Sequence, residues 1–201
     1  MMGGVLALDL AGNFGFSFWK PGAPRPYWGA RELPKPGPKG ENLERAFLTL
    51  RFWLREFHSV RPVTHIVSEA PWQRYVTESN QRQDKFVLVR FLSGLVNEAN
   101  TTALELGVPP ENISETPHST MTKHWVGDSY IKSAPGKIAS VQAAGFRGWK
   151  CETHDSADAN GVLCHFLWTH RDRFPPIPFD VAPISKEAFE LKVRLGDRVR
   201  L

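Results

Sequence analysis

Cysteine is scarce in this sequence, with only Cys151 and Cys164 among 201 residues. Two cysteines are too few for a disulfide framework, and these two lie too far apart to form a CxxC metal or redox pair. Such usage is typical of a protein in a reducing compartment. We therefore expect a cytoplasmic protein.

Long apolar runs are also missing. No stretch approaches the roughly 18 apolar residues of a membrane-spanning helix. No basic segment near residue 1 leads into an apolar run, as it does in a signal peptide. We therefore expect a soluble protein with no membrane partner, and its 201 residues fit one domain of the usual size, roughly 100–200 residues.

The charge balance excludes little, because neither sign is strongly in excess. The net charge is +4 and the isoelectric point is about 9.2, which admits a polyanionic partner without requiring one. Aromatic residues are plentiful, with 7 Trp and 13 Phe. Most of them should pack in the core, but a few at a surface would provide flat rings for stacking on bases.

Hydrophobic periodicity predicts an α/β fold in which a mixed sheet carries helices on both faces. The segment 123–136 has no clear period and is expected to be a loop. One domain should span residues 1–174, followed by a Pro-rich and charged tail at 175–201. The expected strands are 5–10, 16–19, 27–33, 64–68 and 112–116, and the expected helices are 41–58, 81–106, 137–144 and 154–171.

Two acidic residues stand where a buried strand should have apolar ones. Asp9 interrupts the apolar run 5–10, and Glu69 ends the short strand 64–68. Burial of an unpaired carboxylate costs several kcal/mol or neutralises it, so each acid needs a partner. A buried Arg or Lys and a bound cation are equally good explanations for either acid alone.

Two further acids lie at the start of the last expected helix. Asp155 and Asp158 extend its inward apolar stripe by one turn toward the N-terminus. A purely structural explanation is also open, in which Thr153 or Asp155 caps the helix and Asp158 is favoured by the helix dipole. Together with Asp9 and Glu69, however, they form a set of hard oxygen ligands that suits Mg²⁺ or Mn²⁺.

The order of these acids resembles that of the RuvC family of Holliday-junction resolvases, especially its divergent phage and prophage members. The motifs on which this resemblance rests are LALDLAG around Asp9, IVSEAPW around Glu69 and HDSADA around Asp155 and Asp158. The resemblance covers residues from about 5 to 170. One departure is that the family's Asp-Pro-Gly in the first strand is Asp-Leu-Ala here.

The resemblance implies an RNase H-like fold and a crossover junction endonuclease with two Mg²⁺ or Mn²⁺ ions per active site. Asp9, Glu69, Asp155 and Asp158 would be the metal-binding catalytic acids. Lys123 and Lys137 would be the family's two lysines near DNA, with Lys137 close to the reaction, and Trp72 would insert into the opened junction. A homodimer acting on a four-way junction, in a bacterial or phage-infected cell, would match the symmetry of the substrate.

Two other classes of function remain open. Sugar-kinase and actin-like ATPase lobes also begin with an acid in a first strand followed by glycines, although they need a second lobe for which this chain lacks the length. A module that binds branched or single-stranded nucleic acid through Lys, Arg and Trp without cutting is the other class. Four intact acids argue against it. His154, beside Asp155, is a further candidate site residue.

Overall fold

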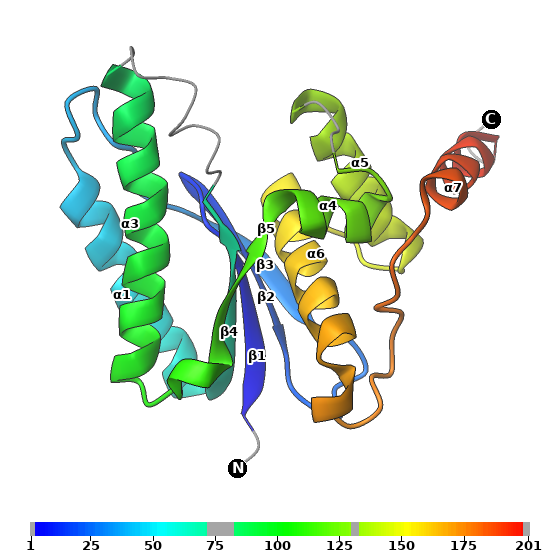
Figure 1. The fold of residues 1–201 in the computed structure, drawn as a ribbon, viewed down its shortest axis with the longest axis horizontal. Coiled ribbons are helices and arrows are strands. Elements are labelled where there is room, and N and C mark those ends of the chain that lie inside the picture. The colour runs from blue at the N-terminus through cyan, green and yellow to red at the C-terminus, as the bar shows by residue number, and fades with distance from the viewer. Residues whose placement is uncertain (1–2, 72–82, 130–132, 199–201) are drawn as a thin grey trace.

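A five-stranded mixed sheet forms the centre of the molecule (Figure 1). The structure is a computed structural model that describes residues 3–71, 83–129 and 133–198. The strand order is β3-β2-β1-β4-β5; β1 pairs antiparallel with β2 and parallel with β4. The strands are β1 (Gly4–Asp9), β2 (Asn13–Trp19), β3 (Tyr27–Glu32), β4 (Val63–Ala70) and β5 (Ile113–Pro117).

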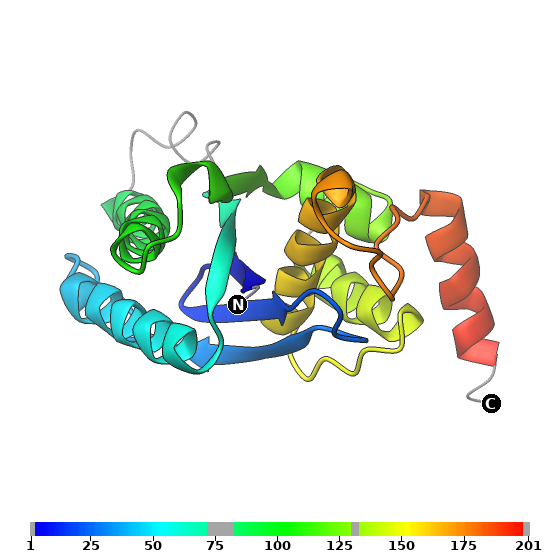
Figure 2. The same ribbon diagram turned by 90° about the horizontal axis from the view of Figure 1, so that it is seen from below.

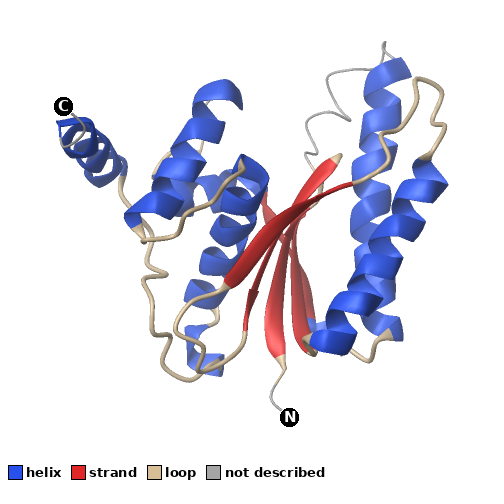
Figure 3. Cartoon of the chain, turned by 180° about the vertical axis from the view of Figure 1, so that it is seen from behind, coloured by secondary structure: helices blue, strands red, loops and turns tan. Residues whose placement is uncertain are grey.

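Helices cover both faces of this sheet. Helices α1 (Leu43–Val60) and α3 (Gln83–Glu105) lie on one face. On the other lie α4 (His118–Val126), α5 (Ser133–Phe146) and α6 (His154–Thr169). The view from below and the view from behind show the same layering (Figures 2 and 3). The expected α/β architecture, with a mixed five-stranded sheet between helices, is confirmed.

Strand β2 shows how the sequence assigns a core to each face. Successive side chains of a strand point to opposite faces, and the three phenylalanines Phe14, Phe16 and Phe18 belong to the core under α1 and α3. The alternate positions Gly15 and Ser17 face α6 instead. The α1 and α3 face is therefore packed with large rings, whereas the first turns of α6 meet the small residues Gly15 and Ser17 and can approach the sheet closely there.

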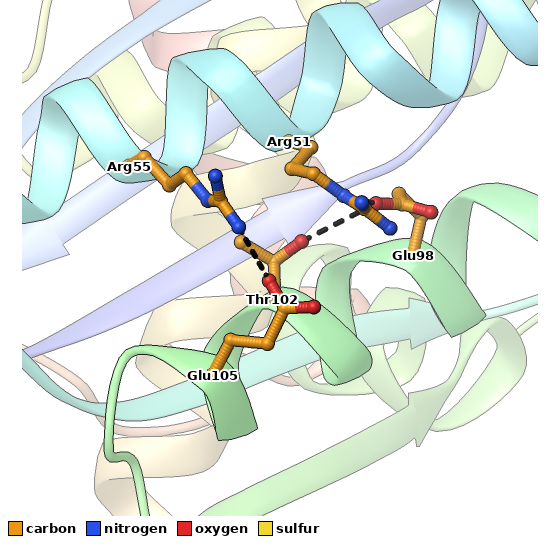
Figure 4. A network of polar contacts seen from close by, with 5 residues as sticks. All are labelled: Arg51, Arg55, Glu98, Thr102 and Glu105. Atoms are coloured by element: carbon orange, nitrogen blue, oxygen red, sulfur yellow. Dashed lines mark hydrogen bonds and ion pairs between the residues drawn. The ribbon is translucent and has the colours of Figure 1, made fainter.

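Two ion pairs join α1 to α3 on the first face (Figure 4). The Arg51 Nε atom lies 2.5 Å from Glu98 Oε1, and Arg55 Nη2 lies 2.8 Å from Glu105 Oε2. Exposed pairs of this kind contribute up to about 1 kcal/mol. The two helices are therefore held mainly by their apolar contacts.

The expectation of a loop at 123–136 was wrong for much of its described part, because residues 123–126 and 133–136 are helical. Helix α4 begins at His118, and α5 begins at Ser133. The nine residues of α4 contain two threonines and a valine with little helical preference. Its stability comes from burial of Met121, His124, Trp125 and Val126, a tertiary contribution that local periodicity does not reveal.

The Pro-rich and charged segment that follows residue 174 is folded against α4 and α5. It includes helix α7 (Lys186–Arg198), and its Val181 and Phe189 are buried in the same core as α6. His124 Nε2 donates to the Val181 carbonyl at 2.9 Å, and Arg147 Nη2 donates to the Ala182 carbonyl at 3.0 Å.

Among the described helices, none has the length and apolar character needed to cross a bilayer.

Candidate active site

The carboxyl ends of β1 and β4 bring two acids side by side. These strands are parallel neighbours in which Leu8 pairs with Ser68, so Asp9 and Glu69 are the next residues on each strand. Both acids share the strand face of the buried residues Val5, Ala7 and Val67, which pack under α4 and α6. Residues 60 positions apart in sequence thus present carboxylates toward the same helical layer.

The start of α6 supplies the other two acids. The Thr153 side chain caps the helix by accepting a hydrogen bond from Ser156 N at 3.2 Å. Asp155 is therefore not needed as the cap, and it lies buried in the first turn with 7% of its surface exposed. Asp158 follows one turn later on the same face. Figure 1 shows this end of α6 beside the upper ends of the strands as drawn.

All four acids line one cavity of about 570 Å³. Its walls come from the ends of β1 and β4, from α3, and from the three helices of the opposite layer. Beside the acids, the lining includes apolar side chains such as Leu92, Val96 and Met121. The cavity also contains Lys137, His118, Thr122, Ser140 and His154. This is large enough for a small ligand or a segment of a larger one.

Burial and neighbouring carboxylates raise the pKa values of Asp9 and Asp158. Burial raises the pKa of Asp9 well above its ordinary value, and the charges of Glu69, Asp158 and Asp155 raise it further, while Lys137 opposes them. Burial also raises the pKa of Asp158 to about 7, although a hydrogen bond from Ser140 counteracts the shift. The site therefore has an excess of negative charge, which a cation would neutralise.

His118 is a site residue that the sequence reasoning missed. Its Nδ1 lies 2.6 Å from Glu69 Oε1, and its Nε2 lies 3.3 Å from the Thr122 hydroxyl. The hydrogen bond to Glu69 raises the pKa of His118. A signal was present, because His118 immediately follows β5, the third parallel strand, and the carboxyl ends of parallel strands meet at one edge.

Ser140 was missed as well, and it illustrates how the second helical layer completes the site. Trp125 Nε1 donates to Ser140 Oγ at 2.9 Å, so the hydroxyl proton of Ser140 is directed to the carboxylate of Asp158. Trp125 and Ser140 are almost fully buried. No sequence signal marks this serine, because its role depends on how α4 and α5 pack.

The remaining predicted residues lie at different distances from the acids. Lys137 lines the cavity and acts electrostatically on Asp9. Lys123 is an exposed residue of α4 that is not among the cavity's lining residues. His154 lines the cavity, with its Nε2 at 3.1 Å from Asp155 Oδ1. Trp72 lies outside the described residues, although Pro71 before it is part of the cavity wall.

The chemistry of this donor set fits a hard divalent cation, since it offers four carboxylates whose mutual repulsion calls for positive charge. Among the described residues, no three His, Cys, Asp or Glu side chains converge as closely as a formed metal site requires. Two of the acids instead contact histidines, Glu69 with His118 and Asp155 with His154. Within the same residues, neither Asp9 nor Glu69 has a Lys or Arg ion-pair partner.

Comparison with known proteins identifies the fold. No family model matches the chain, and no curated protein matches its sequence. Thermus thermophilus RuvC in complex with a Holliday junction substrate superposes with a TM-score of 0.55 at 13% identity, over 90% of this chain and 99% of that chain. A second Thermus thermophilus RuvC structure gives 0.55 at 14% identity with the same coverage.

A eukaryotic protein gives a similar result. The yeast mitochondrial Holliday junction resolvase Ydc2 superposes with a TM-score of 0.51 at 15% identity, over 86% of this chain and 83% of that chain. These superpositions cover 86% to 90% of this chain. The protein has the RNase H-like fold of RuvC-type Holliday-junction resolvases.

Proposed function

We propose that this protein is a metal-dependent endonuclease that cleaves branched DNA, and specifically a Holliday-junction resolvase that makes paired symmetric nicks. The observation that carries the proposal is the convergence of Asp9, Glu69, Asp155 and Asp158 on one cavity of a RuvC-like fold. Mutual repulsion among buried acids destabilises a fold. A cluster of this kind is explained when a cation and a polyanionic substrate use it.

In this proposal the four acids hold two Mg²⁺ or Mn²⁺ ions. Bound there, the ions would supply an activated water and stabilisation of the leaving oxygen. Glu69 and Asp155 would bind metal through their carboxylates, and the contacts with His118 and His154 would orient them. The imidazoles then remain beside the cavity as hydrogen-bond donors.

Lysine charges would bind the phosphate backbone. Lys137 already lowers the pKa of Asp9 across the cavity, so its ammonium is within electrostatic reach of a phosphate at the acids. Lys123, exposed on α4, would contact the backbone farther from the scissile bond. Such contacts provide affinity without sequence preference.

A homodimer is part of the proposal, because two symmetric nicks call for two active sites related by a two-fold axis. The long helix α3 buries Phe91, Leu95 and Ala99 in its own core, while Leu104 remains 49% exposed. On neighbouring α1, Phe52 is 63% exposed. Exposed apolar side chains on α1 and α3 would suit a dimer interface, and light scattering that gives the mass of one 22.7 kDa chain, with and without junction DNA, would contradict it.

Incubation with labelled four-way junction, flap and linear duplex DNA, in Mg²⁺ and in chelator, tests the function. We expect metal-dependent cutting that prefers the junction. Asp9→Asn should abolish cutting while leaving the gel shift of junction DNA nearly intact, because basic residues dominate the affinity. Glu111→Gln, at an exposed carboxylate away from the cavity, is the matched control and should cut normally.

The same assay, run beside a measurement of ATP hydrolysis, decides between the proposal and its rivals. Binding of junctions without any cutting would favour the binding module. Hydrolysis of ATP without nuclease activity would favour the kinase-like reading. Cutting that persists in chelator, or equal cutting of linear duplex, would refute the proposal.

A further inference from the structure

Gly15 lies directly between the two pairs of acids. It is the cross-strand partner of Asp9 in the β1–β2 ladder, and it faces α6. A Cβ atom added at Gly15 would overlap the backbone carbonyl of Asp155 and lie 2.9 Å from Ser156 N. The space that a side chain would occupy at residue 15 is thus filled by the backbone of the acid-bearing turn of α6.

Conformational freedom does not explain this glycine, because its φ is not in the left-handed region. The neighbouring Gly12 is the useful comparison, since a Cβ there would meet nothing within 4 Å. What distinguishes Gly15 is the helix above it. Its missing side chain lets the backbone of Asp155 touch the sheet beside Asp9.

A buried hydrogen bond also holds β2 against α6, one turn farther along that helix; we call this contact between β2 and α6 the seam. Ser17 Oγ lies 2.6 Å from Asn160 Oδ1, and Asn160 Nδ2 lies 3.2 Å from Cys151 Sγ. Ser17 and Asn160 are both fully buried. The contact clamps α6 to β2, but it lies beyond the acids and leaves their distance from Asp9 to be set at Gly15.

We propose that Gly15 is a positioning residue for the metal site: it sets the separation between the acids of α6 and those of the sheet. The proposal rests on the proposed metal-dependent function. A methyl group at residue 15 would meet backbone and not the movable end of a side chain, so it can be accommodated only by moving the start of α6. Metal–ligand distances tolerate about 0.2 Å, so a shift of this kind disrupts coordination before it disrupts the fold.

Mn²⁺ binding measured by calorimetry, together with thermal melting, tests the proposal in the full chain. Gly15→Ala should weaken Mn²⁺ binding by about 10- to 100-fold, as for loss of other groups that orient metal ligands. Gly12→Ala should leave both quantities unchanged. Ser17→Ala breaks the clamp without adding volume, so it should lower the melting temperature while changing Mn²⁺ affinity by less than about threefold, well below the orienting-group range.

The comparison between Gly15→Ala and Ser17→Ala separates positioning from stability. If Mn²⁺ affinity falls in proportion to the loss of melting temperature in both variants, Gly15 is only a packing residue and the proposal is overturned. Unchanged Mn²⁺ affinity in folded Gly15→Ala overturns it as well. Failure of the wild-type chain to bind Mn²⁺ is a distinct result, because it refutes the proposed function itself.

A second variant decides the matter if Gly15→Ala does not fold. Ser17→Thr keeps the hydroxyl and adds one methyl group at a fully buried position under α6. It should weaken Mn²⁺ binding more than Ser17→Ala does at an equal loss of melting temperature. If the two Ser17 variants show the same relation between affinity and melting temperature, the proposal is refuted.

Discussion

Replacement of Asp158 by asparagine should stabilise the metal-free protein while abolishing DNA cleavage. Asparagine keeps the shape of the side chain and removes its charge. Burial, with repulsion from Glu69 and Asp155, raises the pKa of Asp158 from 3.8 to about 7. The carboxylate form is thus strongly disfavoured in the folded protein, and an amide at this position would not be.

The sign follows from proton linkage. A raised pKa means that the folded chain binds the proton more tightly than the unfolded chain, so its stabilising effect is complete below about pH 4 and is lost as the pH rises to about 7. A shift of this size corresponds to about 4 kcal/mol. Part of this amount is offset, because the asparagine amide must replace the carboxylate as the hydrogen-bond partner of Ser140. We therefore expect the free energy of unfolding to rise by about 2–3 kcal/mol at pH 8, which is roughly 4–12 °C in Tm.

Thermal melting in chelator at several pH values between 4 and 8 measures this effect, with Glu111→Gln as the control. The Tm of Asp158→Asn should exceed that of wild type at pH 8, and the two should converge at pH 4. Mg²⁺ should raise the Tm of wild type much more than that of the variant. A variant that is less stable than wild type at pH 8, or a difference that does not change with pH, would refute the reasoning.

Three other predictions follow from the site and its surroundings. His118→Ala should slow single-turnover cleavage about tenfold or more, because it removes the donor that orients Glu69; an unchanged rate would make the contact incidental. Burial lowers the pKa of His124 to about 4, so stability should be lost as the pH falls from about 6.5 to 4, by up to about 3 kcal/mol relative to His124→Gln; parallel melting curves would exclude this. Trp72→Ala should weaken junction binding by about 1–3 kcal/mol and be rescued by junctions already unpaired at the branch point; equal slowing on both substrates would place Trp72 in the core.

The sheet and its acids were predictable because each leaves a local signal. Asp9 and Glu69 are acidic interruptions of apolar strands, and Asp155 and Asp158 share a helical face. Periodicity alone does not order the strands, and it was the motif order that implied the RNase H-like arrangement. All four acids do line one cavity.

The parts that escaped prediction depend on tertiary packing. Helix α4 is short and is stabilised by burial of residues such as Trp125, so neither its presence nor the place of His118 at its start could be read from periodicity. Ser140 and Gly15 are ordinary small residues in sequence. Their meaning comes from what lies opposite them, Asp158 for the serine and the backbone of Asp155 for the glycine.

The seam between β2 and α6 has a consequence for synthesis of the chain. Ser17 and Asn160, which meet there, are 143 residues apart, so the contact belongs to the slowly formed, non-local class. A nascent chain that has emerged only as far as α5 carries Asp9 and Glu69 without Asp155 and Asp158. Half of the acid set is then missing. If the proposed function holds, an unfinished polypeptide that ends before α6 would be unable to cut DNA, because it lacks two of the four acids.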